Sequence, residues 1–256
     1  MKKEFVPDIS SIDYTARVTI DNPIDKESCV RLKKTTNARI CIGRAADRFK
    51  TETLLRFSAD HAVAIDSVWS HVDENIIDEL GFLKVKTLIK DKEEYITRPD
   101  FGRSFSEETI NNIINKCIHK PDVQIIVADG LSSHAIDANI KDIYPIIVDS
   151  INAKGYKLGT PIFVKYGRVA TMDKISEALN AKVTVLLIGE RPGLATGDSM
   201  SSYMAYESST LKPESQRTVV SNIHANGTPP VEAGAEIVSL IELMISKKIS
   251  GVELKI

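Results

Sequence analysis

The sequence contains little cysteine and has almost no net charge. The first fact argues against a zinc-binding protein, and the second argues against a nucleic-acid-binding protein. Its three cysteines, Cys29, Cys41 and Cys117, include no CxxC pair, so we expect reduced thiols rather than a zinc site. The net charge is −2, from 33 basic and 35 acidic residues. This balance predicts no basic surface of the kind that nucleic acid requires.

The chain also lacks the signals of membrane proteins and of several enzyme classes. No apolar run approaches the roughly 20 residues that span a bilayer, and the opening MKKEFVPDIS has no apolar segment of a secretory signal. The motifs GxGxxG, GxxxxGK[ST], GxSxG and HExxH are absent. The five histidines are scattered, and we interpret them as structural: His61, His71, His119, His134 and His224.

The first third of the chain has a helical pattern after a polar arm. Residues 1–22 are irregular, and we expect them to form an N-terminal arm. Residues 23–93 are predicted to form a small helical domain. Its clearest helix, within residues 51–72, places apolar residues at steps of three and four: Leu54, Leu55, Ala62, Ile65, Val68, Trp69 and Val72.

The remainder, residues 94–256, alternates short apolar runs with helices. The runs VQIIV, PIFVK, VTVLLI and VVSNI predict strands, and helices are predicted between them, including a short one near SMSSYMAY. Ser106 and Asp173 are expected to cap two of these helices. Mostly apolar strands are typical of sheets covered on both faces. We therefore predict a doubly wound, mostly parallel, Rossmann-like α/β domain.

Ligands of open α/β sheets bind beyond the carboxyl ends of the strands. Four segments should meet at that edge: Asp129-Gly130, Tyr166–Val169, Gly189–Arg191 and Ser221–His224. The loop GERPGLATGD is rich in glycine, which lets backbone approach a bulky ligand. Asp129 and Glu190 could act as paired carboxylates in an independent small-molecule enzyme. We prefer a capping role for Asp129 and a ligand-orienting role for Glu190.

The same residues resemble the small (light) subunit of ethanolamine ammonia-lyase. LIGERPGL and SNIHxxGTPPVEA are long and specific, and residues 1 to about 20 show no resemblance. The similar segments, in chain order, are ARICIGRAADRFKT, LLRFSADHAVAIDSVW, EYITRPDFGR, IIVADGLSSHAI, FVKYGRVA, LLIGERPGLATGDSMSSYMAY and RTVVSNIHANGTPPVEAG.

This resemblance implies a function that the chain performs only with a partner. The family converts ethanolamine to acetaldehyde and ammonia by radical chemistry with adenosylcobalamin. Substrate and catalytic residues are expected on a large subunit, and this chain is expected to close over the cofactor at the interface of a hetero-oligomer. From the charge balance and the lack of a spanning apolar run, we expect no nucleic-acid or membrane partner. The alternatives left open are the independent enzyme and a purely structural assembly subunit.

Three positions of this sequence match the family's cobalamin contacts: Val169 in YGRV, Glu190 in GERPG and Val219 in RTVVSN. The family often has cysteine at the third position, so Val219 puts a thiol role in doubt and indicates backbone or packing contact. The partner is expected at the helix around Trp69 or near Arg98 to Arg103.

The resemblance also implies a bacterial cytoplasmic location, within a microcompartment. Some members of the family enter it through an amphipathic N-terminal helix. The N-terminal segment MKKEFVPDISSIDYT does not have this pattern, because Pro7 interrupts it. We therefore expect encapsulation to depend on the partner or on another signal.

Overall fold

The computed structural model describes residues 12–14 and 16–255 of the chain. The arm predicted for residues 1–22 lies largely outside them. Internal contacts divide the chain into a first unit, Met1–Asp66 with Gly193–Thr196, and a second unit, Ser67–Pro192 with Gly197–Ile256. The domain boundaries expected at residues 22 and 93 stay predictions.

The first unit contains helix α1 (Lys26–Lys34), a short hairpin of β1 (Arg44–Ala45) and β2 (Arg48–Phe49), and most of helix α2 (Thr51–Trp69). The helical periodicity of α2 is confirmed. Its apolar side chains are largely exposed, however, with Leu54 at 51%, Leu55 at 53% and Trp69 at 50% exposure. The apolar pattern of α2 therefore does not pack into a core of this chain.

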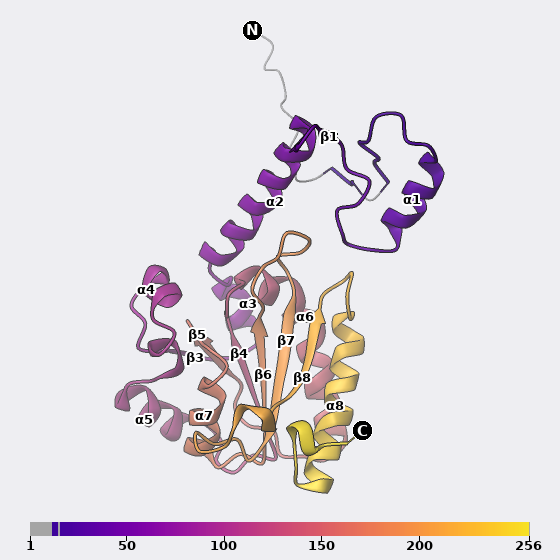
Figure 1. The fold of residues 1–256 in the computed structure, drawn as a ribbon. Helices are drawn as coiled ribbons and strands as arrows, with labels where there is room; N and C mark the ends of the chain where they lie inside the picture. Colours follow the sequence, from indigo (N-terminus) through magenta and orange to yellow (C-terminus); the bar gives the residue numbers. More distant parts are fainter. Residues whose placement is uncertain (1–11, 15, 256) are drawn as a thin grey trace. The chain divides into compact units, whose positions relative to one another are not determined.

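The second unit is built on a six-stranded sheet (Figure 1). Its spatial order is β3-β5-β4-β6-β7-β8. The neighbours from β3 to β6 pair in parallel, whereas β7 and β8 are antiparallel additions. The predicted mixed α/β fold with a mostly parallel sheet is confirmed. The strands are β3 (Leu83–Lys86), β4 (Val123–Ala128), β5 (Ile162–Lys165), β6 (Val183–Gly189), β7 (Met200–Tyr206) and β8 (Thr218–Ile223).

Two of these strands correct the sequence analysis. β3 lies inside the region expected to be largely helical, and β7 occupies the segment expected to form a short helix. β3 is a short edge strand with charged alternate residues, which gives a weak sequence signal. In β7, hydrogen bonds to the flanking β6 and β8 impose the extended form. Tertiary pairing thus overrides local pattern at both places.

The helices of the second unit are α3 (Glu74–Glu79), α4 (Lys92–Thr97), α5 (Glu107–Lys116), α6 (Ser133–Ala153), α7 (Thr171–Leu179) and α8 (Pro230–Lys247), with 3-10 turns at Phe101–Arg103, Glu214–Gln216 and Gly251–Glu253. Ser106 caps α5 as predicted, because its hydroxyl accepts from the Thr109 amide at 3.1 Å. Asp173 is not the cap of α7. It lies inside the helix, whose N-cap is Ala170. Of the described helices, none is long and apolar enough to cross a membrane.

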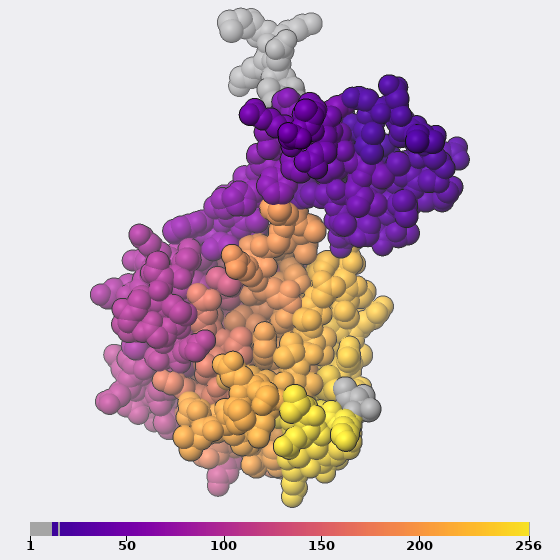
Figure 2. All heavy atoms as spheres, viewed as in Figure 1, coloured from indigo at the N-terminus to yellow at the C-terminus, as the bar shows by residue number. Residues whose placement is uncertain are grey.

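The two faces of the sheet are covered unequally. On one face, α6 and α8 pack against β4, β6, β7 and β8 in one hydrophobic cluster. On the other, α5 and α7 form a second cluster with β3, β5, β4, β6 and Ala205 of β7, and no buried residue of β8 joins it. Figure 1 shows that no helix lies over β7 and β8 on this second face, and Figure 2 shows their orange atoms at the surface. The sheet therefore offers an open half-face beside its carboxyl edge.

Candidate functional site

A cavity of about 450 Å³ lies at the carboxyl edge of the parallel strands and continues onto the open half-face. We call it the edge cavity. Each of the four segments predicted to meet there contributes lining residues, among them Gly130, Val169, Glu190 and Ser221. The connection from β4 leads to β5 on one side, and the connection from β5 returns to β6 on the other. The edge cavity thus lies where the strand order reverses, which is the usual ligand site of open α/β sheets.

The three residues matched to the family's cofactor contacts all line this cavity. Val169 follows β5 and packs partly against the second hydrophobic cluster. Glu190 directly follows β6, and Val219 lies on β8 with 45% of its surface exposed. Val219 pairs with Tyr203 of β7, another lining residue. The fold therefore brings together residues that are separated by up to 50 positions in the sequence.

The carboxylate of Glu190 is held by three donors of this chain. The Ser199 hydroxyl donates to Oε2 at 2.8 Å. The Ser201 hydroxyl and the Asn222 amide both donate to Oε1, the amide at 3.0 Å. Ser199 and Ser201 are buried, at 7% and 3% exposure. These contacts fix the direction in which the carboxylate faces the cavity.

The backbone that supplies the third donor is itself constrained. Asn222 has a φ of 61°, in the left-handed region that asparagine tolerates better than most residues. Its side-chain oxygen accepts from His224 Nε2 at 2.9 Å, while His224 Nδ1 accepts from the Asn226 amide at 3.3 Å. His224 is 5% exposed, which is consistent with the structural role expected for it.

An aromatic and cationic pair forms another wall of the edge cavity. Arg168 lies 4.2 Å from the ring centre of Tyr95 and donates to the Tyr95 carbonyl at 2.7 Å. Its buried Nε atom has no hydrogen-bond partner among the described residues. Tyr95 is fully buried, and its hydroxyl donates to the Gly167 carbonyl at 2.9 Å. α4 thereby holds the turn that carries Arg168 and Val169.

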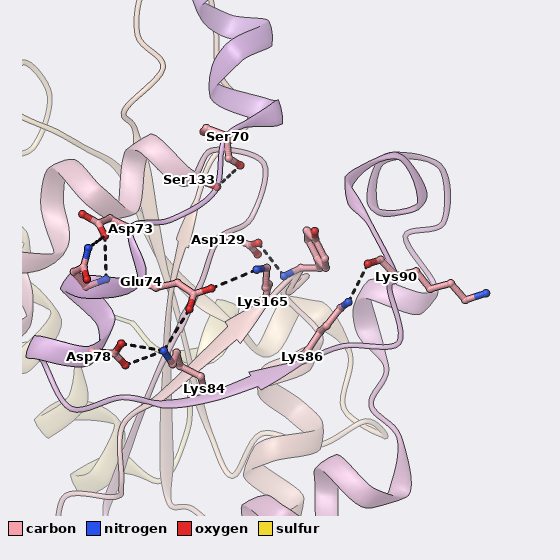
Figure 3. Close-up of polar contacts among 12 residues, drawn as sticks. Ser70, Asp73, Glu74, Asp78, Lys84, Lys86, Lys90, Asp129, Ser133 and Lys165 are labelled. Atoms are coloured by element: carbon pink, nitrogen blue, oxygen red, sulfur yellow. Dashed lines mark hydrogen bonds and ion pairs between the residues drawn. The ribbon is translucent and has the colours of Figure 1, made fainter.

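Asp129 supports this turn rather than facing the cavity. It is 2% exposed, and its carboxylate accepts from the Tyr166 amide at 2.9 Å (Figure 3). It also accepts from the Gly167 amide at 3.1 Å. Burial raises its pKa to about 6, against the opposing effects of the Lys92 charge and of these backbone amides. The preferred capping role of Asp129 is consistent with these contacts. Asp129 is not among the residues that line the edge cavity with Glu190.

Three lysines lie near the ring of Tyr166, which is two residues before Arg168 of the edge cavity. The ammonium groups of Lys86, Lys92 and Lys165 lie 5.3, 5.8 and 5.9 Å from the ring centre. Lys165 pairs with Glu74 at 3.6 Å, and Lys86 donates to a backbone carbonyl (Figure 3). Burial lowers the pKa of Lys92, and burial together with Lys92 and Lys165 lowers that of His71.

The close approach of β4 and β6 at the site requires glycine. Gly130 has a φ of 59°, and a Cβ there would lie 2.2 Å from the Gly189 carbonyl oxygen. Leu131 then donates its amide to the same oxygen at 3.1 Å. The two loops are thus joined directly at the mouth of the edge cavity.

Sequence reasoning missed the donors that hold Glu190 and the aromatic wall. Ser199 and Ser201 were hidden because the segment was expected to be helical, whereas Ser201 lies on the antiparallel strand β7 and Ser199 directly precedes it. Tyr95 lies in the segment EYITRPDFGR, whose resemblance to the family was the only signal available. The structure also contains a second cavity, of about 400 Å³, wholly within the first unit, and its wall includes Phe49 and Phe57. No group of metal-ligating side chains occurs in the described part of the chain.

Comparison with known proteins decides the family. The sequence model described as "Ethanolamine ammonia-lyase light chain (EutC)" matches residues 26–255. The chain belongs to this family. The ethanolamine ammonia-lyase small subunit of Clostridium acetobutylicum is 69% identical over 233 residues, covering 91% of this chain and 96% of its own length. Those of Clostridium perfringens and Listeria monocytogenes are 52% and 50% identical, each covering 98% of this chain and 85% of their own.

Membership of the ethanolamine ammonia-lyase light chain family makes this chain a subunit of an ammonia-lyase. The resemblance expected from LIGERPGL and SNIHxxGTPPVEA is confirmed. Both segments contribute to the edge cavity, through Glu190 and Ser221.

Proposed function

We propose that this chain is the cobalamin-holding small subunit of an adenosylcobalamin-dependent ethanolamine ammonia-lyase. In the reaction, ethanolamine is converted to acetaldehyde and ammonia, and substrate and catalytic residues lie on a large partner subunit. The observation that carries the proposal is the edge cavity, because Val169, Glu190 and Val219 line it together.

The residues of the edge cavity fit part of a cobalamin. The cofactor has primary amide side chains, which donate and accept hydrogen bonds, around an apolar ring. Glu190 offers an oriented acceptor, Arg168 offers donors, and Val169 and Val219 offer apolar contact. A cavity of about 450 Å³ suits a drug-sized ligand, and cobalamin is much larger. The open half-face supports a site that a second subunit completes.

The chain's own contribution is binding and orientation. When bound, adenosylcobalamin supplies the radical through cleavage of its cobalt–carbon bond. Glu190 holds an amide of the cofactor, and the apolar side chains of Val169 and Val219 exclude water from the surface that they cover. Asp129 is assigned no acid or base role, because its carboxylate accepts from the backbone of the turn at Tyr166 and does not line the edge cavity.

Nothing in the geometry favours the independent enzyme. The independent-enzyme interpretation requires Asp129 and Glu190 to contact the same substrate. Of these two residues, only Glu190 lines the edge cavity. Moreover, Glu190 is already bound by three donors of the chain. The assembly-only reading predicts complex formation with cobalamin binding unaffected by changes in the cavity.

Reconstitution tests the proposed function. Ammonia release from ethanolamine with adenosylcobalamin is measured for this chain alone, for its large subunit alone and for the mixture. We expect activity only in the mixture. Turnover by this chain alone on another substrate, with none in the mixture, would contradict the proposal.

A substitution in the edge cavity separates the cofactor role from assembly. Val219→Trp places a large ring on the open half-face, and we expect the complex to form but to bind cyanocobalamin at least 10-fold more weakly. Val252→Trp is the matched control, because Val252 is 78% exposed in a 3-10 turn outside the cavity. Equal cofactor binding by both variants would favour the assembly-only reading.

The partner surface is proposed at helix α2. This helix exposes Leu54, Leu55, Phe57, Val63, Ile65 and Trp69, and such an apolar surface is typical of a protein interface. The alternative surface contains Arg98, which pairs with Asp100 and stacks on Phe101 at 3.8 Å. Co-purification with the large subunit distinguishes them. We expect Trp69→Glu to abolish co-purification and Arg103→Glu to leave it intact. The reverse result would assign the interface to the surface around Arg98 to Arg103.

Three finer assignments also remain proposals. We propose that the α/β part is a Rossmann-like domain, supported by the helices on both faces and the reversal of strand order. The helical domain is proposed for residues 23–93. The microcompartment location is proposed from the family and is tested by fractionating cells that express this chain with and without its partner.

A further inference from the structure

Within the described part of the chain, the Glu190 carboxylate accepts hydrogen bonds from three donors. Its partners are the hydroxyl groups of Ser199 and Ser201 and the backbone amide of Asn222. The two serines are buried, and Asn222 is held in the left-handed region by its contacts with His224. We call these three donors the Glu190 clamp. The clamp gives the carboxylate one orientation and one chemical role, that of an acceptor.

The clamp also limits how many further bonds Glu190 can make. A carboxylate has about four lone-pair positions. Oε1 already accepts two hydrogen bonds, from Ser201 and Asn222, whereas Oε2 accepts only one, from Ser199. The remaining capacity is therefore mainly on Oε2. A ligand that meets this atom in the edge cavity must bring a donor, because the lone pair of an acceptor would face the negatively charged carboxylate oxygen.

We propose that the Glu190 clamp is a specificity device that selects an N–H donor on the ligand and rejects a carboxylate at the same place. This inference rests on the proposed function and deepens it. For a cobalamin, the selected group is one primary amide side chain of the corrin ring. A cobalamin in which that amide is hydrolysed to a carboxylic acid is then the disfavoured ligand.

Ser199 and Ser201 act as positioning residues in this device. Their hydroxyl groups donate to the Glu190 carboxylate and hold it in one orientation. Losing one clamp hydroxyl lets the carboxylate turn, so discrimination between amide and acid should fall. Hydrogen bonds to charged groups contribute about 10- to 100-fold in binding, which sets the size of the expected effect.

The experiment uses the reconstituted complex of this chain with its large subunit. Equilibrium dialysis measures the affinity for cyanocobalamin and for each isomeric monocarboxylic acid made by hydrolysing one amide side chain. In the wild-type complex we expect one isomer to bind about 10- to 100-fold more weakly than cyanocobalamin. In Glu190→Gln that ratio should fall to a few-fold at most, because an amide carries no charge and both accepts and donates.

The serine variants test positioning against simple structural damage. Ser201→Ala should lower the amide-to-acid ratio when Glu190 is present and leave it unchanged in the Glu190→Gln background. A merely structural role would weaken all ligands alike in both backgrounds. Ser239→Ala is the matched control, because this exposed serine lies on α8, and its hydroxyl donates to the Ala235 carbonyl at 3.1 Å. Its ratio should equal that of the wild type.

The outcomes separate the inference from the proposed function. If the wild-type complex does not bind cyanocobalamin, the proposed function fails. If it binds cyanocobalamin and every monocarboxylic acid equally, or if Glu190→Gln keeps the wild-type ratio, the proposed function stands and the clamp inference is overturned.

Discussion

The buried ion pair between Arg217 and Asp173 is the most sensitive point at which to test the packing beside the site. Arg217 Nη2 lies 2.6 Å from Asp173 Oδ2, and the two side chains are only 9% and 6% exposed. Asp173 Oδ1 also accepts from the Ser208 hydroxyl at 2.5 Å. Arg217 directly precedes β8 and lies two residues before Val219, and the pair joins this position to Asp173 on α7.

Arg217→Met removes the charge and keeps an unbranched apolar stem. Asp173 then keeps only Ser208 as a partner and stays buried, which costs about 3–5 kcal/mol of unfolding free energy. Asp173→Leu alone should cost a similar amount, because it leaves Arg217 buried with only its exposed partner Glu214, at 3.2 Å. The double variant should lose much less than the sum, because replacing both partners by apolar groups removes the unpaired charge.

Urea denaturation of the full chain, followed by circular dichroism and by the fluorescence of its single tryptophan, measures these values. Lys84→Met is the matched control. Lys84 pairs with Asp78 at 2.8 Å, but the two side chains are 40% and 61% exposed, so its loss should hardly change the free energy of unfolding. A cost below about 1 kcal/mol for Arg217→Met, or an additive double variant, would refute the reasoning.

Two further predictions concern the edge of the sheet. Gly130→Ala should prevent stable folding, because its Cβ would lie 2.2 Å from the Gly189 carbonyl oxygen. Gly155 has a similar φ of 73° but open space around it, so Gly155→Ala should lower the free energy of unfolding by only about 1–2 kcal/mol. Thermal melts compare the two variants, and equal costs would contradict the steric argument. Because the pKa of Asp129 is raised to about 6, the folded state binds its proton more tightly than the unfolded state, so this residue's contribution to stability is present below pH 4 and is lost as the pH rises to about 6. Relative to the wild type, Asp129→Asn should therefore gain stability between pH 4.5 and 6.5, on the order of 2–3 kcal/mol by urea titration, and a constant difference would exclude this effect.

The sequence predicted which segments meet at the carboxyl edge better than it predicted the strands beside that edge. The parallel strands have apolar runs bounded by turn residues, so their carboxyl ends, with Gly130, Val169 and Glu190, could be assigned to one edge. β7 could not be predicted from its sequence, because MSSYMAY mixes small polar and apolar residues without a clear period. Its strand form depends on pairing with β6 and β8. The error over β7 concealed Ser199 and Ser201.

The amino-acid sequence by itself determined the alternation of strand and helix, the glycine-rich edge and the family, because these depend on local residue patterns and on long matching segments. Only the tertiary structure decided that α2 exposes its apolar side chains, that Asp129 supports a turn, and that three donors converge on Glu190. Exposure and hydrogen-bond geometry depend on which distant segments meet. An antiparallel addition to a parallel sheet brings together residues that no local pattern connects.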